Sequence, residues 1–453
     1  MKILYVDIDT LRPDHLGCYG YARNTSENID AIARDGVRFN EYYCSDAPCL
    51  PSRAALVSGR FGIHNGCINH GGVYAEMRPE GHDRAMQDGF GRFSLPAVMR
   101  RAGMHTATIS SFADRHGAWW FNGGFNECYN VGKRGLEPAD DVLPIALKWL
   151  DDNKDRKDWF LHVHVWDPHI PYRTPEKYGR PFENEPLPDN WMTKELLEYQ
   201  RQHCVGAHSA CEVNGYSDAP DAAHPRQITH VRDLDEFKRL VDEYDTGVWY
   251  ADKRLGEIFD KLREQGIYED TAIIISSDHG MDDVSVNLTS ALVNALQSTN
   301  IPFENAALDM GPFDSQTKIV YNLASGAAQI YFRKPLTSIE QSTLITALSN
   351  ITGVANVYDR AQLDQMNTPK NLGDLVVDCD VGYAFSTSSA EHGSYAQRHT
   401  ILFFSGRGIK SGFSYAPVCR TVDIVPTIYH LNGLISPFTV DGNVLTSILT
   451  AQG

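Results

Sequence analysis

The chain has 453 residues, of which 42% are hydrophobic, and a formal net charge of −17 from 41 basic and 58 acidic side chains. This length permits a large core. The acidic balance argues against nucleic acid or an anionic membrane as a partner, because phosphate-rich partners need a basic surface. An anionic small substrate would require a local positive site, formed by a metal or by clustered Arg and His side chains.

The N-terminal stretch MKILYVDIDT contains a short apolar run that Asp7 and Asp9 interrupt. It is too short for a signal peptide or a membrane anchor, and no later stretch reaches membrane-spanning length. We therefore expect a cytoplasmic protein, unless a leader has been removed from the sequence. The nine cysteines are odd in number and form no C-x-x-C pair, which predicts neither a disulfide framework nor a structural zinc ribbon.

The predicted elements alternate between strands and helices along much of the chain. A buried strand at 2–9 leads to a helix that begins near Ser26 and ends at Gly36. The later predicted elements are helices at 95–103, 142–152 and 236–265 and strands at 105–110, 159–166 and 271–278. This alternation predicts an α/β protein with a mostly parallel central sheet and helices on both faces, in which ligands bind at the carboxyl ends of strands.

Two later segments depart from this alternation. Residues 199–228 are polar and rich in turn formers, which predicts a long surface loop. Residues 286–388 show a β-α-β pattern, with AAQIYF, SIEQSTLITALSNI and VANVYDR as its parts. We therefore expect a small appended α/β subdomain at 286–388, while 1–285 and 389–453 together form the core domain.

Three side chains that suit a metal fall at the ends of two predicted strands, namely Asp9, Asp278 and His279. Two carboxylates and an imidazole fit a divalent cation such as Ca, Mg, Mn or Zn. Capping and ion pairing at the sheet edge is the alternative reading. Asp7 lies on the same face of its strand as Asp9, so it is expected to be a further ligand or the buried partner of a base.

The stretch CLPSR, from Cys49 to Arg53, marks the start of a helix, because Pro51 favours the first turn. The helix N-terminus and Arg53 would both stabilise negative charge near residue 49. A buried and inert residue is the commoner fate of a cysteine. The flanking prolines and the arginine favour a functional role here.

This C-x-P-S-R stretch, with the S-G-R that follows it, resembles the signature of type I sulfatases in the alkaline phosphatase superfamily. IDTLRPDHLGCYGY and ISSDHG resemble the two metal-binding stretches of that family. WDPHIPY resembles the segment with a substrate-facing histidine, and TVDIVPTIYHLNG resembles the C-terminal segment. The resemblance covers nearly the whole chain, and it implies an alkaline-phosphatase-like layered fold for the catalytic core at 1–285 and 389–453.

The resemblance also implies individual roles. Cys49 matches the cysteine that is converted enzymatically to formylglycine (3-oxoalanine), whose hydrate attacks the sulfur of a sulfate ester, and Arg53 matches the arginine that steadies it. Asp9, Asp278 and His279 match ligands of one divalent metal, with calcium foremost and magnesium, manganese or zinc as alternatives. The implied partners are a small-molecule or carbohydrate sulfate ester and the maturation enzyme that generates formylglycine.

His169 matches the histidine near the sulfate and the leaving group. Ser111 and Ala113 stand where many sulfatases place a lysine and a histidine. We expect Arg115 and His116, just downstream, to take over contacts with substrate oxygens and the nucleophile, because an anion site needs cations. A solvated Arg-His pair is the alternative.

Other positions resemble relatives of the sulfatases. Thr10 replaces the second of two adjacent aspartates and His279 replaces an asparagine, as in the phosphonate monoester hydrolases, which use the same formylglycine on phosphorus. The stretch AEHGSYAQRHT resembles the nucleotide pyrophosphatase and phosphodiesterase branch, in which a histidine that His392 matches binds a second zinc. Asp167 and His169 echo the other ligand segment of that branch only loosely, so we expect one metal, with His392 as a substrate- or metal-facing residue.

The sequence thus predicts a formylglycine-dependent sulfatase, a hydrolase that acts on sulfuric ester bonds. A phosphonate monoester or phosphodiester hydrolase on the same scaffold is one alternative. An inactive anion-binding homologue, in which Cys49 stays unmodified, is another.

Overall fold

The computed structural model describes residues 1–67, 77, 93–187, 191–203, 222–228, 231–280, 282–283, 286–305, 313–324, 326–365, 373–380, 382–385, 390–391 and 398–451. Its largest sheet has eight strands in the order β19-β2-β18-β7-β1-β6-β4-β5. Neighbouring strands are parallel except where β18 pairs with β2 and with β7. The bounds are β1 Lys2–Ile8, β2 Val37–Phe39, β4 His105–Ile109, β5 Glu127–Tyr129, β6 Trp159–Val165, β7 Thr271–Ser277, β18 Leu402–Gly406 and β19 Phe413–Tyr415.

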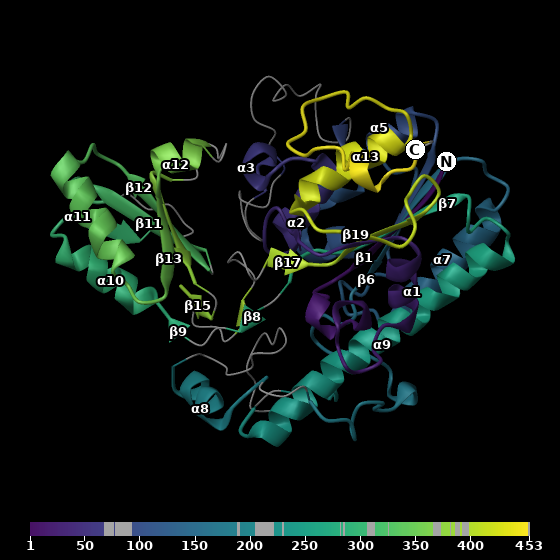
Figure 1. Cartoon of the computed structure of the whole chain (residues 1–453), viewed down its shortest axis with the longest axis horizontal. Helices are drawn as coiled ribbons and strands as arrows, with labels where there is room; N and C mark the ends of the chain where they lie inside the picture. The colour runs from purple at the N-terminus through teal and green to yellow at the C-terminus, as the bar shows by residue number, and fades with distance from the viewer. Residues whose placement is uncertain are drawn as a thin grey trace.

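Helices cover both faces of this sheet (Figure 1), because its central strands are apolar on both sides. Leu4, Val6 and Ile8 of β1 pack toward α1, α7 and α9, whereas Ile3 and Tyr5 pack toward α2, α5 and α13. The bounds are α1 Glu27–Asp35, α2 Cys49–Ser58, α5 Leu95–Arg101, α7 Ala139–Asn153, α9 Leu234–Glu264 and α13 Ile424–Leu431. The predicted layered α/β fold is confirmed.

The longest helix, α9, supports the segment that carries His169. Asp233 caps its N-terminus, since the Asp233 carboxylate accepts a hydrogen bond from the backbone N–H of Glu236. Gly247 allows a close approach, because a Cβ at this position would lie 3.0 Å from the side chain of Pro168. The segment around His169 therefore rests directly on the helix backbone.

A second sheet lies to the left of the first in Figure 1, with its own core and its own helices. Its strand order is β10-β11-β12-β14-β13. The bounds are β10 Phe303–Asn305, β11 Ile319–Ala324, β12 Ala327–Phe332, β13 Val354–Asp359, β14 Leu375–Cys379, α10 Thr289–Ser298, α11 Ser338–Ser349 and α12 Arg360–Gln365. This unit falls within the segment expected to form a subdomain, and its exact boundaries at 286 and 388 stay a prediction.

The predicted surface loop at 199–228 is wrong at its start, because helix α8, Lys194–His203, continues into it. The stretch KELLEYQRQH contains good helix formers and neither Gly nor Pro, so the chain stays helical there. The rest of that loop, 204–221, lies outside the described residues. Among the helices that the structure describes, none is long and apolar enough to span a bilayer.

The shorter elements connect these units. Residues 42–43, 399–400 and 419–420 pair as a three-stranded sheet of β3, β17 and β20. The remaining bounds are α3 Gly62–Asn65, α6 Phe112–His116, β8 Asp282–Asp283, β9 Val286–Asn287, β15 Tyr383–Ala384 and β16 Ala390–Glu391.

Candidate active site

The carboxyl ends of β1 and β7, which are neighbours in the sheet, bring the predicted metal ligands together. Thr10 connects the two ends: its backbone N–H donates to Asp278 Oδ1 at 2.9 Å, and its hydroxyl donates to Asp9 Oδ1 at 2.8 Å. Thr10 has a φ of 55°, a left-handed conformation that is rare for a β-branched residue. Such strain is typical of functional sites, and here it turns the chain sharply after Asp9.

Cys49 is the first residue of α2 and is 4% exposed. Its Sγ lies 3.2 Å from Nε2 of His279. The hydroxyl of Ser52 donates to the carbonyl of Asp278, so the first turn of α2 is fixed to the end of β7. This helix N-terminus would stabilise negative charge at position 49.

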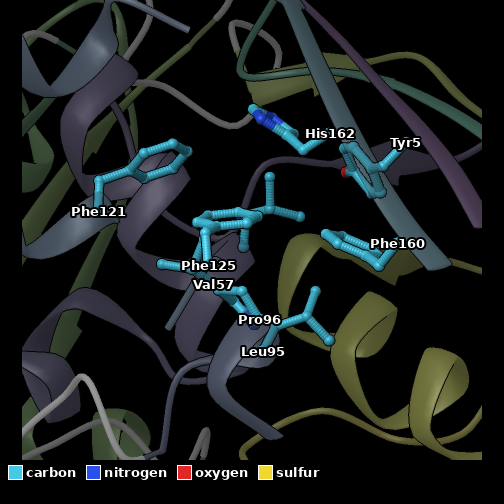
Figure 2. Close-up of a pocket in the computed structure, with 9 residues that line it drawn as sticks. Tyr5, Val57, Leu95, Pro96, Phe121, Phe125, Phe160 and His162 are labelled. Carbon is cyan, nitrogen blue, oxygen red and sulfur yellow. The ribbon is translucent and has the colours of Figure 1, made fainter. Parts of the chain in front are cut away.

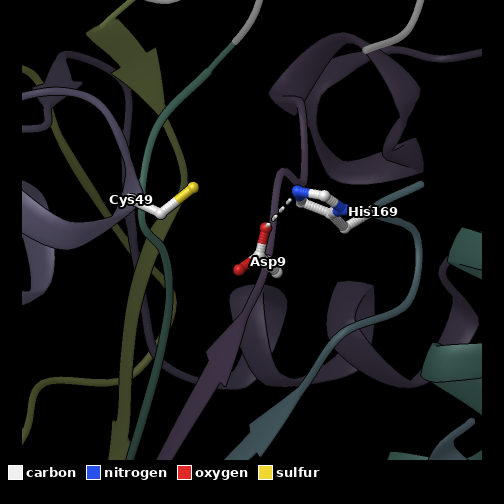
Figure 3. Close-up of side chains that lie close together, drawn as sticks. All are labelled: Asp9, Cys49 and His169. Atoms are coloured by element: carbon white, nitrogen blue, oxygen red, sulfur yellow. Dashed lines mark ion pairs between the residues drawn. The ribbon is translucent and has the colours of Figure 1, made fainter. Parts of the chain in front are cut away.

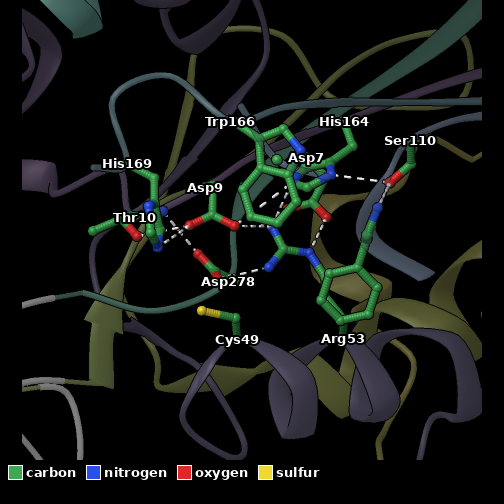
Figure 4. A network of polar contacts seen from close by, with 12 residues as sticks. Asp7, Asp9, Thr10, Cys49, Arg53, Ser110, His164, Trp166, His169 and Asp278 are labelled. Carbon is green, nitrogen blue, oxygen red and sulfur yellow. Dashed lines mark hydrogen bonds and ion pairs between the residues drawn. The ribbon is translucent and has the colours of Figure 1, made fainter. Parts of the chain in front are cut away.

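Arg53 lies among three carboxylates (Figure 4) and is only 1% exposed. Its Nε donates to Asp7 at 2.7 Å, its Nη1 donates to Asp278 at 2.8 Å, and its Nη2 lies 3.0 Å from Asp9 Oδ2. Burial, the largest single influence, would raise the pKa of Asp7 and Asp9, but the Arg53 guanidinium and the neighbouring histidines together outweigh it and hold the pKa of both below the ordinary value. Asp7 is therefore the buried partner of a base, which was one of its two expected roles.

Two sets of side chains are close enough to hold a metal ion, and Cys49 belongs to both. One set is Asp9, Cys49 and His169 (Figure 3), and the other is Cys49, Asp278 and His279. Within each set the ligand atoms lie within 4.8 Å of one another. An oxygen carried by residue 49 would therefore reach both sets.

The residues present fit a divalent cation. Asp7, Asp9 and Asp278 surround the single charge of Arg53, so the carboxylates outnumber the buried guanidinium. Asp9 Oδ2 is buried and is ion-paired with Arg53, but it accepts no well-formed hydrogen bond within the described part of the chain. Carboxylate oxygens and an imidazole suit Ca, Mg, Mn or Zn. The ligand roles of Asp9, Asp278 and His279 stay predictions, and His169, expected to face the substrate, belongs to one of the two potential ligand sets.

His164 is part of the site, although the sequence analysis did not single it out. Its Nε2 lies 2.9 Å from Arg53 Nη2 and 3.6 Å from Asp9 Oδ2, and its Nδ1 lies 3.0 Å from the hydroxyl of Ser110. The alternation of His162 and His164 along a strand was the available signal, because it places both on one face. That face also carries Asp7, whose strand neighbour is His164.

Beneath this polar layer lies an apolar cavity (Figure 2) between α2, α5 and the sheet. Among the described residues that line it, Tyr5 and His162 carry the polar side chains. Burial lowers the pKa of His162 and raises that of Tyr5. None of the candidate catalytic residues that the structure describes lines it. The lining residues are Tyr5, Leu56, Val57, Leu95, Pro96, Phe121, Phe125, Phe160 and His162.

Arg115 and His116 end helix α6 beside the aromatic wall of the site. The guanidinium carbon of Arg115 lies 4.7 Å from the centre of the Trp166 ring, and the His116 ring lies 4.7 Å from that of Phe112. Trp166 in turn lies 5.9 Å from the His169 ring. The expected contacts of Arg115 and His116 with substrate stay predictions, and His392 lies outside the described residues.

The sulfatase family model matches residues 2–303, and the chain therefore belongs to the sulfatase family. Iduronate 2-sulfatase of Mus musculus is 24% identical over 319 residues, covering 62% of this chain and 54% of that protein. An arylsulfatase of Clostridium perfringens is 22% identical, covering 62% and 63%. An N-acetylglucosamine-6-O-sulfatase of Bacteroides thetaiotaomicron is 20% identical, covering 62% and 58%. The chain thus spans less than two thirds of the length of each.

Solved structures share the fold at low sequence identity. A protein in complex with its substrate D-glucosamine-2-N,6-O-disulfate aligns with a TM-score of 0.58 and 16% identity, covering 100% of this chain and 80% of that one. A phosphonate monoester hydrolase from Silicibacter pomeroyi aligns with a TM-score of 0.56 and 17% identity, covering 100% of this chain and 77% of that one. Murine ectonucleotide pyrophosphatase/phosphodiesterase 5 aligns with a TM-score of 0.55 and 15% identity, covering 99% of this chain and 100% of that one. These likenesses confirm the predicted alkaline-phosphatase-like fold.

Proposed function

We propose that this chain hydrolyses a sulfate monoester through a formylglycine formed from Cys49, with one divalent cation bound beside it. The observation that carries the proposal is the position of Cys49, which belongs to both sets of potential metal ligands and heads a helix whose Arg53 is ion-paired to Asp9 and Asp278. Calcium is the first choice of metal because two of the ligands are carboxylates, while the imidazole of His279 also admits Mg, Mn or Zn.

The bound cation would supply Lewis acidity, which makes the formylglycine hydrate a better nucleophile. One hydroxyl of the hydrate would lose its proton to solvent, and its oxygen would form a bond to sulfur while the bond between sulfur and the ester oxygen breaks. His169 protonates the leaving alkoxide, and the guanidinium of Arg53 offsets negative charge at the transferred group. The second hydroxyl of residue 49 then loses its proton, the carbon–oxygen bond to sulfate breaks, and the aldehyde is re-formed. Water adds to the aldehyde and restores the hydrate.

A sulfated carbohydrate is the substrate class that the relatives favour, since iduronate and N-acetylglucosamine sulfatases are among them. The test is a panel of sulfated mono- and disaccharides, aryl sulfates and alkyl sulfates, assayed with matured enzyme. Turnover of a sulfated sugar above the aryl and alkyl sulfates would support this class, and turnover of an alkyl sulfate alone would contradict it.

A phosphonate monoester or phosphodiester hydrolase is the second candidate. Thr10 favours it, because its hydroxyl occupies the position beside Asp9 at which an adjacent aspartate would add a negative charge. Phosphonate and phosphodiester substrates assayed beside sulfate esters would separate the two. A higher kcat/KM on phosphorus would transfer the proposal to this candidate.

The proposed partners are the sulfate ester and the enzyme that converts Cys49. A chain in which Cys49 stays a thiol in its native host would be an anion-binding homologue without turnover. The chemical state of residue 49 is therefore the decisive property.

A further inference from the structure

Arg173 is a buried cation to which the proposed reaction gives no role. It follows His169 by four residues and is 8% exposed. Its Nη2 donates to the carbonyl of Ile170 at 2.9 Å. Its Nε and Nη1 are buried and have no hydrogen-bond partner within the described part of the chain. Such a group is costly, because a buried guanidinium loses its hydration and regains only one hydrogen bond here.

Another buried arginine of the same region is fully satisfied. Arg226 is 1% exposed, and it donates from Nε to the carbonyl of Thr174 at 2.7 Å and from Nη1 to Glu243 at 2.8 Å. Its Nη2 donates to the carbonyl of Gly179 at 2.8 Å. Buried polar groups are almost always paired in this way, so the exception calls for a partner beyond the described residues, such as a bound ligand.

The guanidinium of Arg173 is held beside the candidate active site. The carbonyl of Ile170 accepts its hydrogen bond and is also the partner of His169 Nδ1. The Nε2 atom of the same His169 lies 3.9 Å from Asp9 Oδ1. Arg173 therefore lies next to a ring that reaches the Asp9 and Cys49 cluster.

The charges around Arg173 do not neutralise it. Burial lowers the pKa of Arg173, and the nearby positive charge of Arg115 lowers it further. The carboxylates of Asp167, Asp9 and Glu137 raise it, but they offset the lowering only in part. Within the described residues, no carboxylate accepts a hydrogen bond from its Nε or Nη1. An additional anion at this position would be stabilised by both Arg173 and Arg115.

We propose that Arg173 binds an oxygen of the anionic group of the substrate through its two open nitrogens, beside His169. A guanidinium suits this task because its nitrogens form a fixed planar fork that matches a tetrahedral oxyanion. Arg173 would supply the positive charge that Ser111 and Ala113 lack. The inference rests on the proposed function for the identity of the anion, a sulfate ester.

Binding of inorganic sulfate to the purified 453-residue chain tests this role without turnover. Arg173→Gln removes the charge, Arg173→Lys keeps the charge without the fork, and Arg226→Gln is the matched control. Titration calorimetry should show sulfate affinity about 10- to 100-fold weaker in Arg173→Gln than in the parent. Arg173→Lys should fall between them, and Arg226→Gln should match the parent.

Thermal unfolding separates a binding role from a structural one. Arg173→Gln should unfold at the same temperature as the parent or a higher one, because it removes an unpaired buried charge. Arg226→Gln should unfold at a lower temperature, because it leaves Glu243 buried without its partner. Sulfate affinity equal to that of the parent in Arg173→Gln would overturn the inference, and so would a parent protein that binds no sulfate.

The binding role of Arg173 and the proposed sulfatase activity can fail separately. If the parent hydrolyses sulfate esters and Arg173→Gln keeps the parental KM and kcat, the inference fails while the proposed function stands. If the parent binds sulfate through Arg173 but hydrolyses only phosphorus esters, the proposed function fails while the inference stands.

Discussion

The sulfur of Cys49 lies 3.2 Å from Nε2 of His279, although 230 residues separate the two in the chain. The contact joins the first turn of α2 to the carboxyl end of β7, where Asp278 also receives a hydrogen bond from Arg53. A reactive group at position 49 would therefore meet a charged and buried environment as soon as the sheet and α2 have packed together.

Replacing Cys49 by alanine should abolish turnover and leave the fold intact. The expected loss is on the order of 10³-fold or more, because a missing nucleophile removes the covalent step. Steady-state assays and a thermal unfolding curve measure the two effects. Cys44→Ala is the matched control, since Cys44 is also buried and should be dispensable. Activity retained in Cys49→Ala would exclude a nucleophile at this position.

Removing the metal with a chelator should stop catalysis and lower thermal stability. In the proposed site, the buried carboxylates Asp9 and Asp278 would then lose the cation that offsets their charge. Saturation at about 100 times the dissociation constant stabilises a protein by about 2.7 kcal/mol, which is the size of the expected loss. Adding back Ca, Mg, Mn or Zn singly should identify the metal by recovery of rate. A rate indifferent to chelation would rule out metal activation.

His169→Ala should slow substrates with poor leaving groups far more than nitrophenyl esters. An alkoxide needs a proton in order to leave, whereas nitrophenolate leaves without one. The expected loss is about 10²- to 10⁴-fold on alkyl or sugar sulfates. Comparing kcat/KM for the two substrate types measures it. Equal losses on both would remove His169 from the acid role and leave it as a metal ligand.

Asp46 should make stability depend on pH. Burial raises its pKa from the ordinary value of 3.8 to about 7. The neutral carboxyl of the folded state therefore contributes stability below about pH 4, and this contribution is lost as pH rises toward 7. Asp46→Asn cannot ionise, and its amide oxygen can still accept the hydrogen bond from the N–H of Gly62. The melting temperature of Asp46→Asn minus that of the parent should be larger at pH 8 than at pH 5. An equal difference in melting temperature at pH 5 and pH 8 would contradict the raised pKa of Asp46.

The strand ends of the site were predictable because each follows a short apolar run. Asp9 and Asp278 come directly after buried strands, and parallel strands end at the same edge of a sheet. The sequence also indicated Cys49 and Arg53, through Pro51 and the start of a helix. The local sequence pattern is sufficient to predict such residues, because the strand or helix that carries each one determines its position.

The remaining site residues depend on tertiary contacts. His164 belongs to the site because β6 pairs with β1 in a register that places it beside Asp7. Arg173 stands out because its Nε and Nη1 have no hydrogen-bond partner in the described residues. The sequence could not show this, since the charged groups around Arg173 come from several distant segments. Helix α8 was missed at its end because turn formers farther along the chain dominated the prediction for the whole segment.

The most direct test of the central claim is the mass of the tryptic peptide spanning residues 39–53, taken from protein produced in the native host. Fragmentation must assign any change to Cys49, because the peptide also contains Cys44. Conversion of the thiol to the aldehyde lowers the mass by roughly 18 Da. The account predicts this loss at residue 49 in catalytically active protein. Active protein that carries an intact thiol at residue 49 would contradict it.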